Sequence, residues 1–155
     1  RGWLSVVTPF DFFDCEQPLR EGAARFAGGN NNITALVGLE AALALLEAAG
    51  RAEIEQRVLT LAQLVRSGLH AQGHEVIGPD GGGERSGIVC FRPRLANRRT
   101  LDATALVQRL TSACGAVVAA RNGAVCVSPH FYNTEEDITR FLHGLERVLR
   151  EETPG

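Results

Sequence analysis

Residues 121–137 constrain the fold more strongly than any other part of the chain. The dipeptide Asn122-Gly123 favours a two-residue turn between antiparallel strands. An apolar run over 124–127 follows this turn. Further along, Asn133 or Thr134 stands directly before three acidic residues. Acidic residues suit the first turn of a helix because the helix dipole favours negative charge there. The segment predicts a hairpin over 116–127 that leads into a helix, whose apolar face is formed by Ile138, Phe141, Leu142, Leu145, Val148 and Leu149.

Two helices are expected earlier in the chain. Leucines recur at three- and four-residue steps over 33–49, with Asn32 as a candidate N-cap and Gly50 as the residue that ends the helix. A similar apolar repeat over about 51–72 predicts the second helix, which ends before Gly73. Short β-like runs at 74–77 and 87–91 come next, and a helix over about 102–114 has Asp102 as its candidate cap.

These elements give the order α-α-β-β-α-β-β-α, which implies an α+β fold. In that fold a small, mostly antiparallel sheet is covered on one face by helices. Residues 1–32 lack clean periodicity, are rich in aromatic residues and carry turn signals at Pro9, Pro18 and the Gly/Asn run 28–32. We therefore expect 1–32 to be a lead-in segment that packs on another domain or subunit, and 33–155 to form the small α+β domain.

Composition narrows the classes of function. The net charge is −2 and acidic residues alternate with arginines, so the chain lacks the clustered basic face of a nucleic-acid-binding protein. No apolar run approaches 18 residues and no signal peptide is recognisable, so we expect no membrane association. The four cysteines show no CxxC spacing and the histidines no metal-ligand spacing, which predicts no metal site. We expect free thiols in a reduced, cytoplasmic setting.

Three groups of residues are candidates for binding. The Gly/Asn-rich segment before the first helix, with Gly29 and Asn30, offers backbone N–H groups and amide donors to an anion; the alternative is a plain turn and helix cap. Arg121, at the end of a short strand, is suited to grip a carboxylate with two parallel hydrogen bonds, or is a surface arginine. His130 follows Pro129 in a loop and is either a site histidine or an ordered loop side chain.

The same landmarks resemble the C-terminal part of class V aminotransferases, a superfamily of pyridoxal-phosphate enzymes of fold type I that includes cysteine desulfurases, kynureninases and isopenicillin N epimerase-like proteins. The resemblance rests on Gly2-Trp3, on residues 25–33 leading to Gly38-Leu39, on 86–89, on 121–123 and above all on 127–138. It covers essentially the whole chain. It implies a small C-terminal domain that acts with an N-terminal pyridoxal-phosphate domain of the same polypeptide, in a homodimer that binds a small-molecule amino acid or amine.

The resemblance also assigns roles, and the chain departs from the family pattern at Asn30, at Cys126 and at Ala27, which replaces a common acidic residue. Asn30 stands where the family often has a threonine that touches the cofactor phosphate, and Cys126 stands where it usually has the arginine that anchors the substrate carboxylate. Arg121 matches another arginine near the substrate, and we interpret Cys126 as an inert buried thiol. All sixteen basic residues are arginine, so the chain has no lysine for the covalent imine with pyridoxal phosphate. We expect no cofactor bound covalently to this chain and no catalytic residue in it.

Two further hypotheses stay open at this point. The chain is a degenerate, non-catalytic relative that keeps the fold and dimerises, or it is a free-standing α+β module that binds an amino acid through Arg121. Whether the chain takes part in an enzyme, and which reaction that enzyme catalyses, is not fixed by the sequence.

Overall fold

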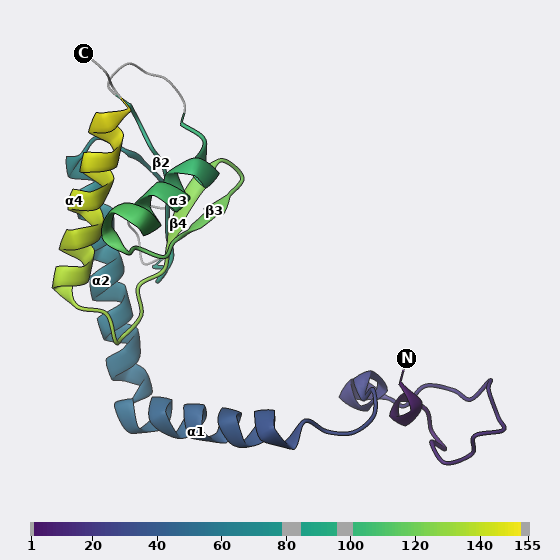
Figure 1. Cartoon of the computed structure of the whole chain (residues 1–155). Helices are drawn as coiled ribbons and strands as arrows, with labels where there is room; N and C mark the ends of the chain where they lie inside the picture. Colours follow the sequence, from purple (N-terminus) through teal and green to yellow (C-terminus); the bar gives the residue numbers. More distant parts are fainter. Residues whose placement is uncertain (1, 79–84, 96–100, 153–155) are drawn as a thin grey trace. The chain divides into compact units, whose positions relative to one another are not determined.

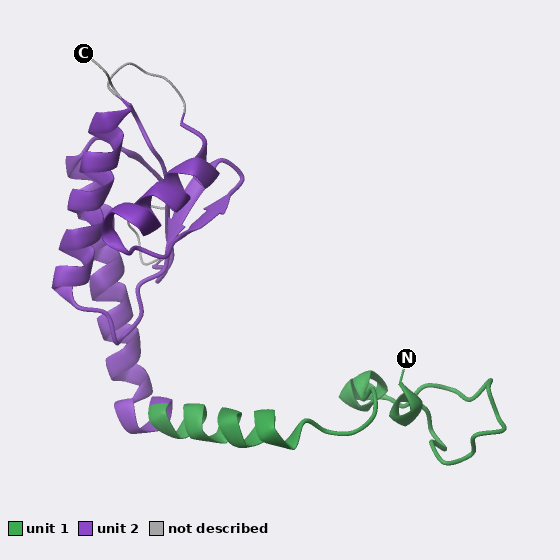
Figure 2. Ribbon diagram, viewed as in Figure 1, with its two compact units in different colours: residues 1–45 green, residues 46–155 purple. Residues whose placement is uncertain are grey.

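The computed structural model describes residues 2–78, 85–95 and 101–152, and the chain divides into two compact units. The first comprises residues 1–45 and the second residues 46–155 (Figure 2). The division that we expected after residue 32 falls inside the first unit.

The second unit is an α+β domain with a four-stranded antiparallel sheet, as predicted. Its strands are β1 (Glu75–Ile77), β2 (Val89–Arg92), β3 (Ala119–Arg121) and β4 (Ala124–Val127), in the spatial order β1-β2-β4-β3. Its helices are α2 (Arg51–Ala71), α3 (Ala103–Cys114) and α4 (Glu135–Glu151), and α2 runs beside α4 (Figure 1).

The sheet has one buried and one open face because successive side chains alternate along each strand. Val89 pairs with Val127 and Phe91 with Val125, and all four side chains lie on the buried face. The helices pack against that face, and the core cluster contains Leu61, Val65, Leu69, Leu106, Leu110, Ile138, Phe141, Leu145 and Val148. We call the other side the open face; its residues are Glu75, Ile77, Cys90, Arg92, Ala119, Arg121 and Cys126.

The start of α4 has the capping chemistry that the sequence predicts. The Thr134 hydroxyl accepts a hydrogen bond from the Asp137 N–H at 3.2 Å, and the Asp137 carboxylate accepts one from the Thr134 N–H at 3.0 Å. The hydrogen bond from the Thr134 backbone N–H lowers the pKa of the Asp137 carboxyl, and the hydrogen bond from the Asn133 side-chain amide lowers it further. Arg57 on α2 forms an ion pair with Glu135 and donates to the Asn133 carbonyl at 2.9 Å, so it ties α2 to the first turn of α4.

The first unit contains two short 3₁₀ helices, Trp3–Ser5 and Gly22–Phe26, and most of α1 (Ile33–Ala49). The buried Ser5 hydroxyl donates to the Ala27 carbonyl at 2.8 Å, and the buried Gln17 accepts from both the N–H and the hydroxyl of Thr8. The Asn32 side chain caps α1 by accepting from the Ala35 N–H at 3.0 Å. These polar contacts hold the unit together.

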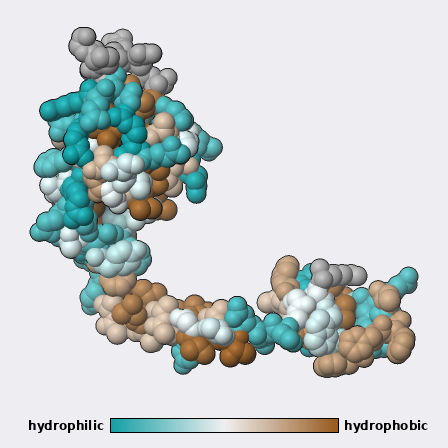
Figure 3. Space-filling model, in the orientation of Figure 1, coloured by the Kyte–Doolittle hydropathy of each residue, from teal (hydrophilic) through white to brown (hydrophobic). Residues whose placement is uncertain are grey.

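Helix α1 has no buried residue, although its sequence is apolar on nearly all sides. Leu36, Leu39 and Leu43 on the predicted apolar face are each at least half exposed, and so are Val37 and Leu45 on other faces. Figure 3 shows these apolar side chains gathered along α1. Such a helix is typical of the interior of a larger protein, because a helix at a solvent boundary has a polar side.

Gly50 separates α1 from α2 with a φ of 84°. Its N–H donates to the carbonyls of Leu46 and Glu47, which ends α1 as predicted. Among the described residues no single helix combines the length and the apolar composition needed to cross a membrane; only α1 and α2 taken together across this break have both.

The ion pair of Arg57 and Glu135 predicts an acid-sensitive contribution to stability. The hydrogen bond from Arg57 lowers the pKa of Glu135 from 4.5 to about 2. Because the folded-state pKa lies below the unfolded value, the contribution is complete above about pH 4.5 and is lost as the pH falls through about 2. We expect Glu135→Gln to lower the urea midpoint at pH 7 and to change it little at pH 2. Glu136→Gln in the same helix turn is the control, and an equal pH dependence in both variants would contradict the assignment.

Candidate functional site

Arg121 lies at the hairpin turn between β3 and β4, on the open face of the sheet. Asn122 and Gly123 both adopt positive φ, 48° and 74°, which is the two-residue turn that the sequence predicts. The turn leaves the Arg121 side chain exposed, and its Nη1 donates to the Ala120 carbonyl at 2.8 Å. The guanidinium therefore stands at the solvent edge of the open face, where a carboxylate can approach it.

His130 lies in the loop between β4 and α4, and this loop is held by reciprocal hydrogen bonds. The His130 N–H donates to the Asn133 side-chain oxygen at 2.9 Å, and the Asn133 N–H donates to the His130 carbonyl at 2.9 Å. The ring of His130 contacts those of Phe131 and Tyr132, with centroids 5.0 and 5.2 Å away. Its Nδ1 is buried and has no hydrogen-bond partner within the described ranges. A buried nitrogen without a partner is unusual in a folded protein, which makes His130 a candidate binding residue.

Arg121 and His130 flank β4 at opposite ends. Arg121 precedes the turn before Ala124, whereas His130 follows the last strand residue, Val127. A strand of four residues spans roughly 10 Å at about 3.4 Å per residue. The two predicted substrate residues therefore do not converge on one point; they border a strip of the open face that contains Cys126.

Cys126 forms a disulfide with Cys90, so its interpretation as an inert buried thiol is wrong. The two residues are directly opposite in the pairing of β2 with β4, with their Cα atoms 4.1 Å apart, and both lie half-buried on the open face. This pairing places their side chains close enough for a cross-strand bond. The expectation that these two cysteines are free thiols is therefore wrong, and the pair gives no support to the reduced setting that we inferred. Cys15 and Cys114 are free.

Gly29 and Asn30 lie in the first unit, whereas Arg121 and His130 lie in the second. Gly29 packs close to the indole of Trp3, since a Cβ at this glycine would lie 3.1 Å from the indole nitrogen. Asn30 is exposed, and the cap of α1 is made by Asn32. A role for Gly29 and Asn30 in binding a phosphate stays a prediction.

A cavity of about 450 Å³ lies beside the loop that carries His130. Ser128, Pro129 and Tyr132 line it from the loop, and Asp137 and Arg140 from the first turns of α4. The two α4 side chains form an ion pair at 3.2 Å. In the described part of the chain no three His, Cys, Asp or Glu side chains gather in a way that would hold a metal ion. This cavity therefore presents a paired carboxylate and guanidinium together with hydrogen-bonding groups.

The comparisons with known proteins agree on one family. The family model described as aminotransferase class-V matches residues 10–141. A probable cysteine desulfurase from Pyrococcus abyssi (strain GE5 / Orsay) is 30% identical over 143 residues, which cover 88% of this chain and 36% of that protein. The chain thus spans about a third of the length of this relative.

Solved structures show the same fold. The apo structure of a cysteine desulfurase from Thermococcus onnurineus NA1 superposes with a TM-score of 0.72 at 22% identity, over 87% of this chain and 36% of that chain. The complex of the cystine C-S lyase C-DES with cysteine persulfide gives a TM-score of 0.71, also at 22% identity, over 93% of this chain and 36% of that chain. At this level of identity the likeness concerns the fold alone.

The disulfide predicts a measurable loss of stability on reduction. It closes a loop with a sequence separation of 36, and loops of this size typically add about 2–4 kcal/mol. We expect the double variant Cys90→Ala/Cys126→Ala to lose about this amount of unfolding free energy in urea under oxidising conditions, and to become insensitive to dithiothreitol. Cys15→Ser, which removes an exposed free thiol, is the control. Titration of four free thiols in the unreduced, unfolded wild-type protein would contradict the pairing.

Proposed function

The chain belongs to the aminotransferase class-V family, and we propose on this premise that it is the small C-terminal domain of a pyridoxal-phosphate enzyme that acts on an amino acid or amine. The observation that carries the proposal is the match of the family model over residues 10–141 in a chain that spans 36% of its relative. The rest of such an enzyme would supply the cofactor domain. We propose that this domain contributes residues to the substrate side of the active site.

This chain does not by itself fit pyridoxal phosphate. The cofactor needs a lysine for its covalent attachment, and the chain contains none. Gly29 and Asn30 offer only exposed backbone and amide groups near the start of α1. We therefore derive no chemical step from these residues alone. In the proposed enzyme the N-terminal domain would hold the cofactor, and Gly29 and Asn30 would at most contact its phosphate.

Arg121 is the residue that we propose to bind the substrate carboxylate. It lies on the same face of the sheet as Cys126, which stands where the resemblance places the carboxylate-binding arginine. A sulfur in a disulfide has no strong hydrogen-bond donor, whereas a guanidinium offers two parallel donors that match a carboxylate. We propose that His130 contacts the other end of the substrate through its orphan Nδ1.

We also propose that α1 and the aromatic lead-in segment pack against the remainder of the polypeptide or a second subunit. Phe13 and Phe26 are 99% and 83% exposed, and α1 buries none of its side chains. Large apolar side chains exposed in this number mark an interaction surface in a folded protein. This surface, with the family membership, supports the homodimer expected from the sequence.

One observation favours a second candidate function. The Cys90–Cys126 disulfide stands where the family resemblance places the substrate-binding arginine, so this chain has lost the usual carboxylate contact. A non-catalytic relative that keeps the fold and the assembly would tolerate that loss. Cofactor uptake by the full-length protein separates this candidate from an active enzyme.

We expect the full-length protein that contains this domain to bind pyridoxal phosphate through a lysine outside residues 1–155. The measurement is the cofactor absorption spectrum before and after borohydride reduction, followed by identification of the modified peptide. A reduced cofactor fixed on one lysine peptide, with a spectrum that changes on addition of L-cysteine or L-alanine, supports an active enzyme. A protein that takes up no cofactor would instead be the non-catalytic relative.

For the active enzyme, we expect Arg121→Ala to lower kcat/KM for its amino-acid substrate by about 10- to 100-fold, mainly through KM. The cause is the loss of charge-assisted hydrogen bonds to the carboxylate. Arg92→Ala is the matched control, because Arg92 lies on the same open face but is paired with Glu75 at 2.8 Å. Equal losses in the two variants would refute a specific role for Arg121.

A further inference from the structure

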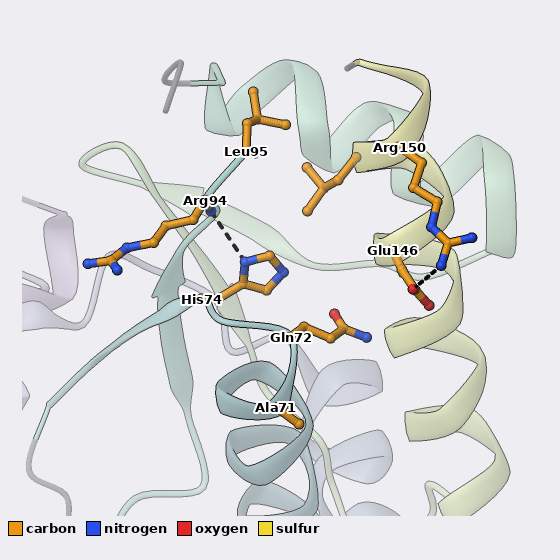
Figure 4. Close-up of a pocket in the computed structure, with 8 residues that line it drawn as sticks. Ala71, Gln72, His74, Arg94, Leu95, Glu146 and Arg150 are labelled. Atoms are coloured by element: carbon orange, nitrogen blue, oxygen red, sulfur yellow. Dashed lines mark hydrogen bonds and ion pairs between the residues drawn. The ribbon is translucent and has the colours of Figure 1, made fainter. Parts of the chain in front are cut away.

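A second cavity, of about 500 Å³, opens between the C-terminal end of α2, the start of β1 and the last turns of α4 (Figure 4). It belongs to the second unit and is lined by residues of α2 and α4, so it is separate from the strip of open face that Arg121 and His130 border. Its volume is within the range of small-molecule sites. Two polar side chains inside it, Gln72 and His74, each have an atom with no hydrogen-bond partner among the described residues.

His74 presents an unused donor to this cavity. The residue is 6% exposed, and its Nδ1 accepts the Arg94 N–H at 3.3 Å. Because Nδ1 accepts, the neutral ring carries its proton on Nε2. Burial lowers the pKa of His74, which favours that neutral form. The Nε2 atom is buried and has no partner in the described part of the chain.

Gln72 presents the complementary acceptor. Its Nε2 donates to the Leu142 carbonyl at 3.1 Å, and this bond fixes which way the amide points. The Oε1 atom is then left buried, also without a partner among the described residues. Figure 4 shows the Gln72 amide and the His74 ring next to each other at the cavity. The cavity therefore offers one donor and one acceptor side by side.

The rim of the cavity carries opposite charges. Glu146 and Arg150 on α4 form an exposed ion pair at 2.5 Å. The side chains of Leu95 and Leu149 form the apolar part of the cavity wall. The guanidinium of Arg94 points away from the cavity (Figure 4). A ligand would thus meet hydrogen-bonding groups in the interior and one cation and one anion at the mouth.

We propose that this cavity binds a small molecule with a primary carboxamide, and that free glutamine or asparagine is its simplest ligand. A carboxamide places a carbonyl acceptor beside an N–H donor, which matches the His74 Nε2–H and the Gln72 Oε1 in one group. The α-ammonium and α-carboxylate of such an amino acid match Glu146 and Arg150 at the mouth. A carboxylate in place of the carboxamide leaves Gln72 Oε1 facing an acceptor, so glutamate and aspartate are rejected.

The test is calorimetric titration of the full chain with L-glutamine, L-asparagine, L-glutamate and L-aspartate. We expect L-glutamine or L-asparagine to bind with a Kd near or below about 1 mM. The corresponding acid, L-glutamate or L-aspartate, should bind at least about 10-fold more weakly. Gln72→Met removes the acceptor while keeping a similar volume, and it should weaken amide binding by about 10-fold or more. Gln63→Met, on an exposed part of α2, is the matched control and should bind as the wild type does.

A second readout follows the histidine directly. The ¹⁵N shift of His74 Nε2 should change on addition of the amide and not on addition of the acid, which separates binding at this cavity from binding elsewhere. Absence of binding by both amides, equal binding of amide and acid, or unchanged binding in Gln72→Met would each overturn the proposal, and the cavity would then be a hydrated one. These outcomes do not depend on pyridoxal phosphate or on Arg121, so a failure here would leave the proposed function unaffected.

Discussion

The pairing of β2 with β4 is the contact on which the rest of the second unit depends. The two strands lie at the centre of the sheet, and their paired residues Cys90 and Cys126 are 36 positions apart along the chain. Their register puts Val89, Phe91, Val125 and Val127 on one face, where three helices cover them, and leaves Cys90 opposite Cys126 on the other. A slip of one residue would exchange these faces, exposing the valines and Phe91 and burying the cysteines, so the apolar core and the open face are determined together.

The sequence predicted correctly those features of the fold that depend on interactions between residues close together in the chain. The cap at Thr134, the turn at Asn122-Gly123 and the end of α1 at Gly50 depend on hydrogen bonds and φ values within a few residues, and each was readable from residue type. Contacts between distant segments were not readable in this way. Neither cysteine has a neighbour in sequence that reveals the other, and the orphan atoms of Gln72 and His74 become evident only once α2, β1 and α4 are packed.

The sequence named candidate site residues, and the structure added where they lie. Arg121 and His130 were chosen because an arginine before a turn and a histidine before a helix are recognisable in the chain, and their binding roles stay predictions. Their placement at opposite ends of β4 depends on that strand being continuous between them. The leucine repeat over 33–49 correctly predicted the helix α1. It did not show that the other faces of α1 are also apolar and that the helix buries none of its residues in this chain.

The proposed role of Arg121 in place of the arginine missing at Cys126 depends on how far apart the two residues lie on the sheet. In the pairing of β3 with β4, Arg121 is opposite Ala124 and Ala119 is opposite Cys126, so the arginine is two residues, or about 7 Å, along the strands from the row of the disulfide. All four side chains belong to the same face of the sheet. An arginine side chain is long and flexible enough to reach back over that row, which a shorter cation would not do. The disulfide carries no charge, so it would not repel a carboxylate held by Arg121 in the proposed enzyme. Such a carboxylate would lie on the open face that also carries Cys126, where the resemblance places the usual arginine.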